Sequence, residues 1–188
     1  VSPRTGEIMF GLNLVVHKGK TIFVADTSVH EYPNSEQMSE IAISAARVVR
    51  LFGFDPKVAF VSHSTFGQPV TSRTKHIRKA VDILKEKNVD FEFDGDMQPD
   101  VALNEDYKSL YPFSKIVGIA NILIMPGQHS AAISYKMMKE LGDTKVIGPL
   151  LIGLGLPIEI APLRTSTSEL INLASIAAYS ADVINYKK

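Results

Sequence analysis

Short apolar runs alternate along the chain with longer stretches of helical spacing. The first two runs, residues 8–16 and 21–25, favour β-structure and flank a four-residue segment that contains Gly19. Because glycine readily adopts the positive φ of a tight turn, these runs predict a β-hairpin. Further strands are predicted at residues 57–62, 91–94, 120–125, 146–147 and 158–160, and the run at residues 120–125 is almost continuously apolar.

Four stretches with apolar side chains every three or four residues predict helices. Asn34 or Ser35 can cap the first helix, which Gly53 ends. The other three are expected to begin at Thr71 or Ser72, at about His129, and at Ser166 or Thr167, the last one ending at Lys187 and Lys188.

Strands that alternate with helices and are apolar throughout need cover on both faces. This pattern predicts an α/β fold, a three-layer sandwich with a mainly parallel sheet and an antiparallel hairpin portion. The 188 residues suffice for one substantial core. The chain has no initiator Met and reaches its first apolar run at Ile8, so we expect it to be a fragment of a longer polypeptide.

Composition excludes several classes of protein. Twenty Lys and Arg balance twenty Asp and Glu, so no net positive field favours nucleic acid or an anionic membrane surface. Glycine and proline interrupt the longest apolar stretch, residues 147–160, which therefore does not predict a membrane-spanning helix. The absence of cysteine excludes disulfides and thiolate chemistry and is typical of a cytoplasmic protein.

Four segments follow predicted strands, where α/β folds usually bind ligands. Residues 62–68 and 125–130 carry hydroxyls, histidines and glycine, and either hold a phosphate-bearing ligand or form self-satisfied turns. Residues 148–155 are rich in glycine but lack a nucleotide fingerprint, which favours close backbone packing. Residues 94–100 contain three carboxylates at spacing unlike a calcium loop and predict a solvated turn.

No known catalytic or metal motif is complete. The five histidines include no pair at zinc-ligand spacing, and no Gly-x-Ser-x-Gly elbow is present. From the residues alone, the chain is an α/β ligand-binding domain of unknown ligand.

Six ordered segments carry a resemblance to phosphate acetyltransferases. They are residues 23–30, 62–67, 93–98, 120–126, 147–154 and 172–174. The versions Asp-Thr-Ser-Val-His-Glu, Met-Pro-Gly-Gln-His-Ser-Ala and Gly-Pro-Leu-Leu-Ile-Gly-Leu are most similar to the C-terminal phosphotransacetylase-like domain of bacterial NADP-dependent malic enzymes. The resemblance implies a phosphotransacetylase or isocitrate-dehydrogenase-like fold, with residues 1–188 as the later half of that domain.

One departure from the family bears on activity. The resemblance implies that active acetyltransferases carry a Ser-Arg pair before the last helix and an Asp six residues beyond that Arg. The corresponding positions here are Pro162, Leu163 and Glu169. Neither Pro162 nor Leu163 can handle a proton or stabilise an oxyanion, so no catalytic residue is predicted. Arg164 is displaced by one position, and its rescue of activity stays open.

The resemblance then implies a regulatory and oligomerisation domain of an NADP-dependent malic enzyme. Acetyl-CoA would be its allosteric inhibitor, and the domain would form at least a dimer. The parent would convert malate to pyruvate with NADP and Mg or Mn in a missing catalytic domain, and this segment itself would hold no cofactor or metal. The alternatives are an active phosphate acetyltransferase and a purely structural oligomerisation domain.

By the same resemblance, eight residues are expected to border the ligand cleft: Ser64, Thr65, Gly67, Asn121, Pro126, His129, Ser130 and Arg164.

Overall fold

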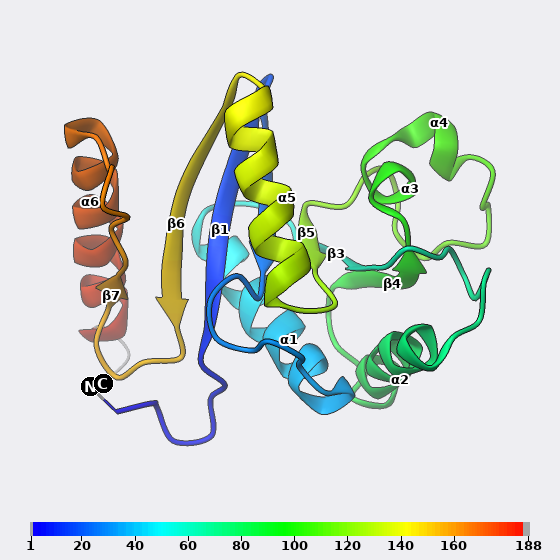
Figure 1. Cartoon of the computed structure of the whole chain (residues 1–188). Helices are drawn as coiled ribbons and strands as arrows, with labels where there is room; N and C mark the ends of the chain where they lie inside the picture. Colours follow the sequence, from blue (N-terminus) through cyan, green and yellow to red (C-terminus); the bar gives the residue numbers. More distant parts are fainter. Residues whose placement is uncertain (1, 186–188) are drawn as a thin grey trace.

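A seven-stranded mixed sheet runs through the computed structural model, which describes residues 2–185 and the side chains of residues 2–182 (Figure 1). The strand order is β4-β3-β5-β2-β1-β6-β7. The strands are β1 (Phe10–His17), β2 (Lys20–Ala25), β3 (Lys57–Val61), β4 (Glu92–Met97), β5 (Ile122–Ile124), β6 (Thr144–Ile152) and β7 (Ile158–Glu159). The first four in this order are parallel, and β1, β6 and β7 add antiparallel pairings.

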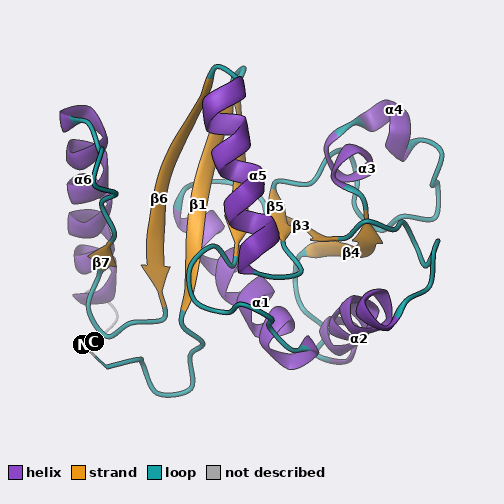
Figure 2. Cartoon of the chain, viewed as in Figure 1, coloured by secondary structure: helices purple, strands orange, loops and turns teal. Residues whose placement is uncertain are grey.

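Helices cover both faces of the sheet. They are α1 (Ser35–Leu51), α2 (Ser72–Glu86), α3 (Pro99–Leu103), α4 (Glu105–Lys108), α5 (Gln128–Leu141) and α6 (Thr167–Asn185). The core on one face is built from α1, α2 and Leu173 of α6, and the core on the other face from α3 and α5. Figure 2 shows α5 crossing in front of the strands and α6 beside β6. The predicted three-layer α/β class is confirmed.

The predicted helix starts are confirmed in atomic detail. The Asn34 side chain accepts a hydrogen bond from the Gln37 amide, and the Gln37 side chain accepts one from the Asn34 amide. Thr71 and Thr74 cap α2 in the same reciprocal way. Two orphan amides are satisfied at each helix start, which fixes where the preceding loop ends. The predicted terminal residues Lys187 and Lys188 lie outside the described residues.

The sheet differs from the prediction at β6. The predicted short strand at residues 146–147 extends to nine residues, because β6 pairs along the whole of β1 in antiparallel register. The segment between β4 and β5, for which no element was predicted, forms α3 and α4.

Close backbone packing, predicted for residues 148–155, is confirmed. A Cβ atom on Gly153 would lie 2.2 Å from the carbonyl oxygen of Ile8, and one on Gly148 would lie 2.9 Å from that of Leu12. Both glycines have positive φ, so a side chain at either position would be strained as well as crowded.

The prediction of a solvated turn at residues 94–100 is wrong. Asp94 and Asp96 lie within β4, where they are 8% and 0% exposed. The Asp94 carboxylate accepts hydrogen bonds from the amides of Gly95 and Lys115, and that of Asp96 accepts one from the Ser64 hydroxyl. These donors replace water and allow the carboxylates to be buried.

Among the described residues, no helix is long and apolar enough to cross a membrane. The described part of the chain also contains no group of three metal-ligating side chains close enough to hold an ion.

Candidate functional site

The loops after β2, β5, β3 and β4 meet at one edge of the sheet, because the carboxyl ends of parallel strands point the same way. We call this the carboxyl edge; it comprises residues 26–34, 62–70, 97–98 and 125–130. It brings together the two hydroxyl-rich segments that the sequence selects as ligand loops.

Asp26 orders the loop after β2. Its carboxylate is 1% exposed and accepts hydrogen bonds from the amides of Gly11, Ser28, Val29 and His30, at 2.7 to 3.1 Å. The His30 ring nitrogen Nδ1 lies 2.7 Å from the same carboxylate. Five polar contacts thus fix the first turn of the loop, and the Gly11 contact ties the loop to β1.

The loop after β3 is bonded to the end of β4. The Ser64 hydroxyl donates to Asp96 Oδ2, and the Gln98 amide donates to Thr65 Oγ1 at 3.2 Å. The Phe66 amide donates to the carbonyl of Asp96 at 2.7 Å. Ser64 is fully buried and Thr65 is 7% exposed, so both side chains hold the loop in place instead of offering their hydroxyls to solvent.

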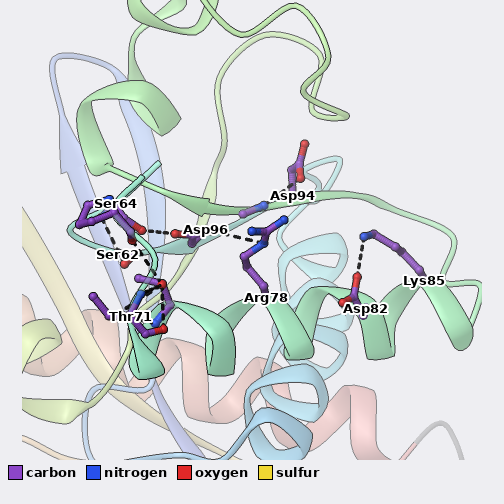
Figure 3. Close-up of polar contacts among 11 residues, drawn as sticks. Ser62, Ser64, Thr71, Arg78, Asp82, Lys85, Asp94 and Asp96 are labelled. Atoms are coloured by element: carbon purple, nitrogen blue, oxygen red, sulfur yellow. Dashed lines mark hydrogen bonds and ion pairs between the residues drawn. The ribbon is translucent and has the colours of Figure 1, made fainter. Parts of the chain in front are cut away.

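Gly67 lies against a cation that sequence reasoning missed. It has a φ of 84°, and a Cβ atom there would lie 2.6 Å from Arg78 Nη1. Arg78 Nε is 4.0 Å from Asp96 Oδ1, a buried oxygen without a hydrogen-bond partner. Figure 3 shows Ser64 and Arg78 approaching Asp96 from opposite sides. The sequence around Arg78 contains no recognisable motif. Arg78 lies on α2 and comes close to this loop only in the folded chain.

Pro126, His129 and Ser130 lie where β5 gives way to α5. The Ser130 hydroxyl donates to the carbonyl of Gly127 at 2.7 Å, as a helix-start residue does. His129 Nε2 lies 3.3 Å from Glu31 Oε1 of the loop after β2. A Cβ atom on Gly127 would lie 2.4 Å from the Glu31 carbonyl oxygen, so only glycine allows this approach of the two loops.

Asn121, which the resemblance places at the ligand cleft, is not part of the carboxyl edge. It precedes β5 and therefore lies at the amino end of that strand. Its side chain accepts from the Lys57 amide at 2.8 Å and donates to the Asp55 carbonyl at 2.7 Å. The side chain thus pins the start of β3 to the start of β5, at the opposite edge of the sheet from Pro126.

Arg164 lies in a separate cavity of about 350 Å³ between α5, β6 and α6. We call this the α5–α6 cavity; its lining includes Lys136, Lys139, Pro162, Arg164 and Glu169. Leu163, in the same loop, is fully exposed and does not line it. Among the described residues, Arg164 makes no hydrogen bond or ion pair.

The Glu169 carboxylate is hydrogen-bonded at the start of α6. One carboxylate oxygen accepts from the Ser166 amide at 2.7 Å and from its hydroxyl at 2.8 Å, and the other lies 3.0 Å from Lys139 Nζ. The Ser166 amide, Lys139 and the Ser166 hydroxyl, in that order, lower the pKa of Glu169 to about 2. Glu169 is therefore an anion at neutral pH.

The comparisons with known proteins confirm the resemblance. A family model described as phosphate acetyl/butaryl transferase matches residues 2–178. An NADP-dependent malic enzyme of Rhizobium meliloti (strain 1021) is 46% identical over 96% of this chain, and a phosphate acetyltransferase of Bacillus subtilis (strain 168) is 32% identical over 89%. These matches span 24% and 52% of the two relatives.

A solved phosphotransacetylase from Streptococcus pyogenes superposes with a TM-score of 0.88 at 30% identity, over 96% of this chain and 56% of that one. The chain is thus similar to about half of that phosphotransacetylase, and it spans about a quarter of the malic enzyme it matches.

Asp26→Asn should lower the free energy of unfolding by about 2 to 3 kcal/mol, because the new NH₂ group would face buried N–H donors and leave them unpaired. Urea unfolding measures the difference. Asp106→Asn, an exposed change on α4, is the matched control and should stay within about 0.5 kcal/mol of the wild type. Equal stability of both variants would show that the Asp26 contacts do not hold the loop.

Glu169 should make the free energy of unfolding depend on pH in the acid range. Because its pKa is about 2 in the folded chain and 4.5 as the reference value, its contribution is complete above about pH 4.5 and disappears as the pH falls through about 2. Glu169→Gln keeps a capping oxygen but does not titrate. Urea unfolding of both proteins across this pH range should show the wild type losing more stability, and parallel curves would contradict the assignment.

Proposed function

This chain belongs to the phosphate acetyl/butaryl transferase family, and we propose that it is a regulatory module of an NADP-dependent malic enzyme that binds acetyl-CoA without transferring its acetyl group. The 46% identity to the Rhizobium meliloti malic enzyme supports the choice of parent. Oxidative decarboxylation of malate with NADP and Mg or Mn would then belong to the part of that protein outside this chain.

The side chains beside the α5–α6 cavity carry the proposal, because Pro162 and Leu163 stand where the resemblance implies a Ser-Arg pair. Acyl transfer needs a group that moves a proton and a donor that stabilises the oxyanion. Pro162 has no hydroxyl, and the Leu163 side chain is apolar and fully exposed. Glu169 is an anion whose oxygens already accept hydrogen bonds from Ser166 and Lys139. A carboxylate with a pKa of about 2 is a poor base at neutral pH.

Arg164 could restore acetyl transfer only together with a proton-transfer group beside it. Its guanidinium could bind an anion, but a proton-transfer group would have to lie beside it. The nearby Glu169 is paired with Lys139 instead. Arg164 and Lys136 therefore supply positive charge for binding an anionic group of the ligand.

Self-association is the second part of the proposal. Ile133, Met137 and Leu141 form a stripe along α5 and are 58%, 54% and 81% exposed. Ala131 is the one residue of this helix that is buried in the described structure. Apolar stripes of this kind usually mark an interface. An effector that prefers one state of such an oligomer would shift its population by no more than the differential affinity.

Acetyl-CoA titrated into the protein should give a calorimetric binding signal and raise the melting temperature, because a ligand at a hundredfold excess over Kd stabilises the folded state by about 2.7 kcal/mol. Arg164→Ala should weaken binding roughly tenfold if the guanidinium meets an anionic group of the ligand. Arg47→Ala, on the exposed side of α1, is the matched control and should bind as the wild type does.

Two outcomes would contradict the proposal in different ways. Absence of heat and of any thermal shift at high acetyl-CoA excess would favour the purely structural oligomerisation domain. Binding that is unaffected by Arg164→Ala would place the effector away from the α5–α6 cavity.

A further inference from the structure

Three exposed side chains from separate segments form a stack at the carboxyl edge. The Arg73 guanidinium lies over the Tyr32 ring, 5.0 Å from its centroid. The His129 ring is nearly parallel to that of Tyr32, with an interplanar angle of 16° and centroids 6.4 Å apart. This separation is larger than that of directly overlapping rings, so the two rings form an offset, step-like platform. We call these three residues the Tyr32 platform.

Contacts on both sides of Tyr32, at the start of α5 and with α2 fix the backbone that carries the platform. The Asp26 carboxylate fixes the turn before Tyr32, and the capping box at Asn34 fixes the helix start after it. The close approach of Gly127 to the Glu31 carbonyl fixes the start of α5, which carries His129. A hydrogen bond of 3.2 Å between a ring nitrogen of His76 and the Pro33 carbonyl links the loop to α2, which carries Arg73.

The fold does not require these side chains. Tyr32 is 62% exposed, the His129 side chain is 71% exposed, and neither belongs to a hydrophobic core. A rigidly mounted, exposed aromatic surface with a cation at one side has the character of a recognition surface, because aromatic faces bind planar groups at little cost in conformational entropy.

We infer that the Tyr32 platform binds a purine base that carries phosphate groups, the nucleotide end of coenzyme A. The inference rests on the proposed function and adds a subsite to it. The base stacks on the Tyr32 and His129 rings, as bases do on aromatic platforms. The phosphates lie towards Arg73, whose guanidinium can donate two parallel hydrogen bonds to them.

The charges around the platform set the orientation of this ligand. Glu31 lies beside His129 and is largely exposed, so its carboxylate repels phosphate and can accept a hydrogen bond from an exocyclic amino group of the base. Arg73 lies on the side of α2 and attracts phosphate. These charges therefore favour the base near Glu31 and the phosphates near Arg73.

Helix α5 connects the platform with the α5–α6 cavity. His129 and Lys136 are seven residues apart and hence lie on one stripe of the helix. His129 belongs to the platform, and Lys136 lines the cavity beside Arg164. The same helix therefore carries one residue of the platform and one residue of the cavity lining.

The direct test is a titration with adenosine 3′,5′-bisphosphate, followed by calorimetry and amide chemical shifts. Tyr32→Ala should weaken binding roughly 5- to 100-fold, the range for losing one stacked base, whereas Tyr32→Phe should bind as the wild type does. Tyr107→Ala removes another exposed tyrosine, on α4, and should have no effect. Arg73→Ala should weaken the bisphosphate more than unphosphorylated adenosine.

The outcomes separate this inference from the proposed function. If acetyl-CoA binds and Tyr32→Ala changes neither its affinity nor that of the bisphosphate, the platform is not the subsite and the sensor proposal stands. If the bisphosphate binds in a Tyr32-dependent way but acetyl-CoA does not bind, the platform is supported and the sensor proposal fails. No binding of the bisphosphate to the wild type would overturn the inference.

Discussion

A single buried carboxylate, that of Asp26, holds together the edge of the sheet that carries the Tyr32 platform. Its contacts with four amides and one imidazole replace the water that a buried charge needs. Because one of these amides belongs to Gly11, the carboxylate joins the antiparallel half of the sheet to the parallel half. The loop that follows can then carry Tyr32 to an exposed position without being mobile itself, and α5 can begin directly beside it.

Features that depend on neighbours in sequence were predictable. The capped starts of α1 and α2, the hairpin at Gly19 and the continuous apolar strands each follow from a few adjacent residues. The length of β6 was not predictable in this way, because its residues pair along the whole of β1, more than a hundred positions earlier. Burial of Asp96 likewise depends on Ser64, which lies 32 residues away.

The residues of the candidate site also differ in whether neighbours in sequence or distant residues determine their positions. Ser64, Thr65, Gly67, Pro126, His129 and Ser130 follow strands, and the topology brings them to one edge as expected. Asn121 was expected at the ligand cleft from the resemblance, and its side chain joins the starts of β3 and β5 at the opposite edge of the sheet. The contributions of Tyr32, Arg73 and Arg78 were invisible in the sequence, because each of these side chains acquires its partners only when separate loops and helices are assembled.

Binding and catalysis have different structural requirements in this protein. In our proposal, cations and aromatic faces hold a thioester with a nucleotide tail, whereas making or breaking that thioester would require a proton-transfer group and an oxyanion donor at one point. The most direct measurement is the rate of acetyl-CoA formation from acetyl phosphate and coenzyme A, on this chain and on the malic enzyme that we propose as its parent. The account predicts no formation above the uncatalysed background, and an enzyme-like rate with either protein would contradict it.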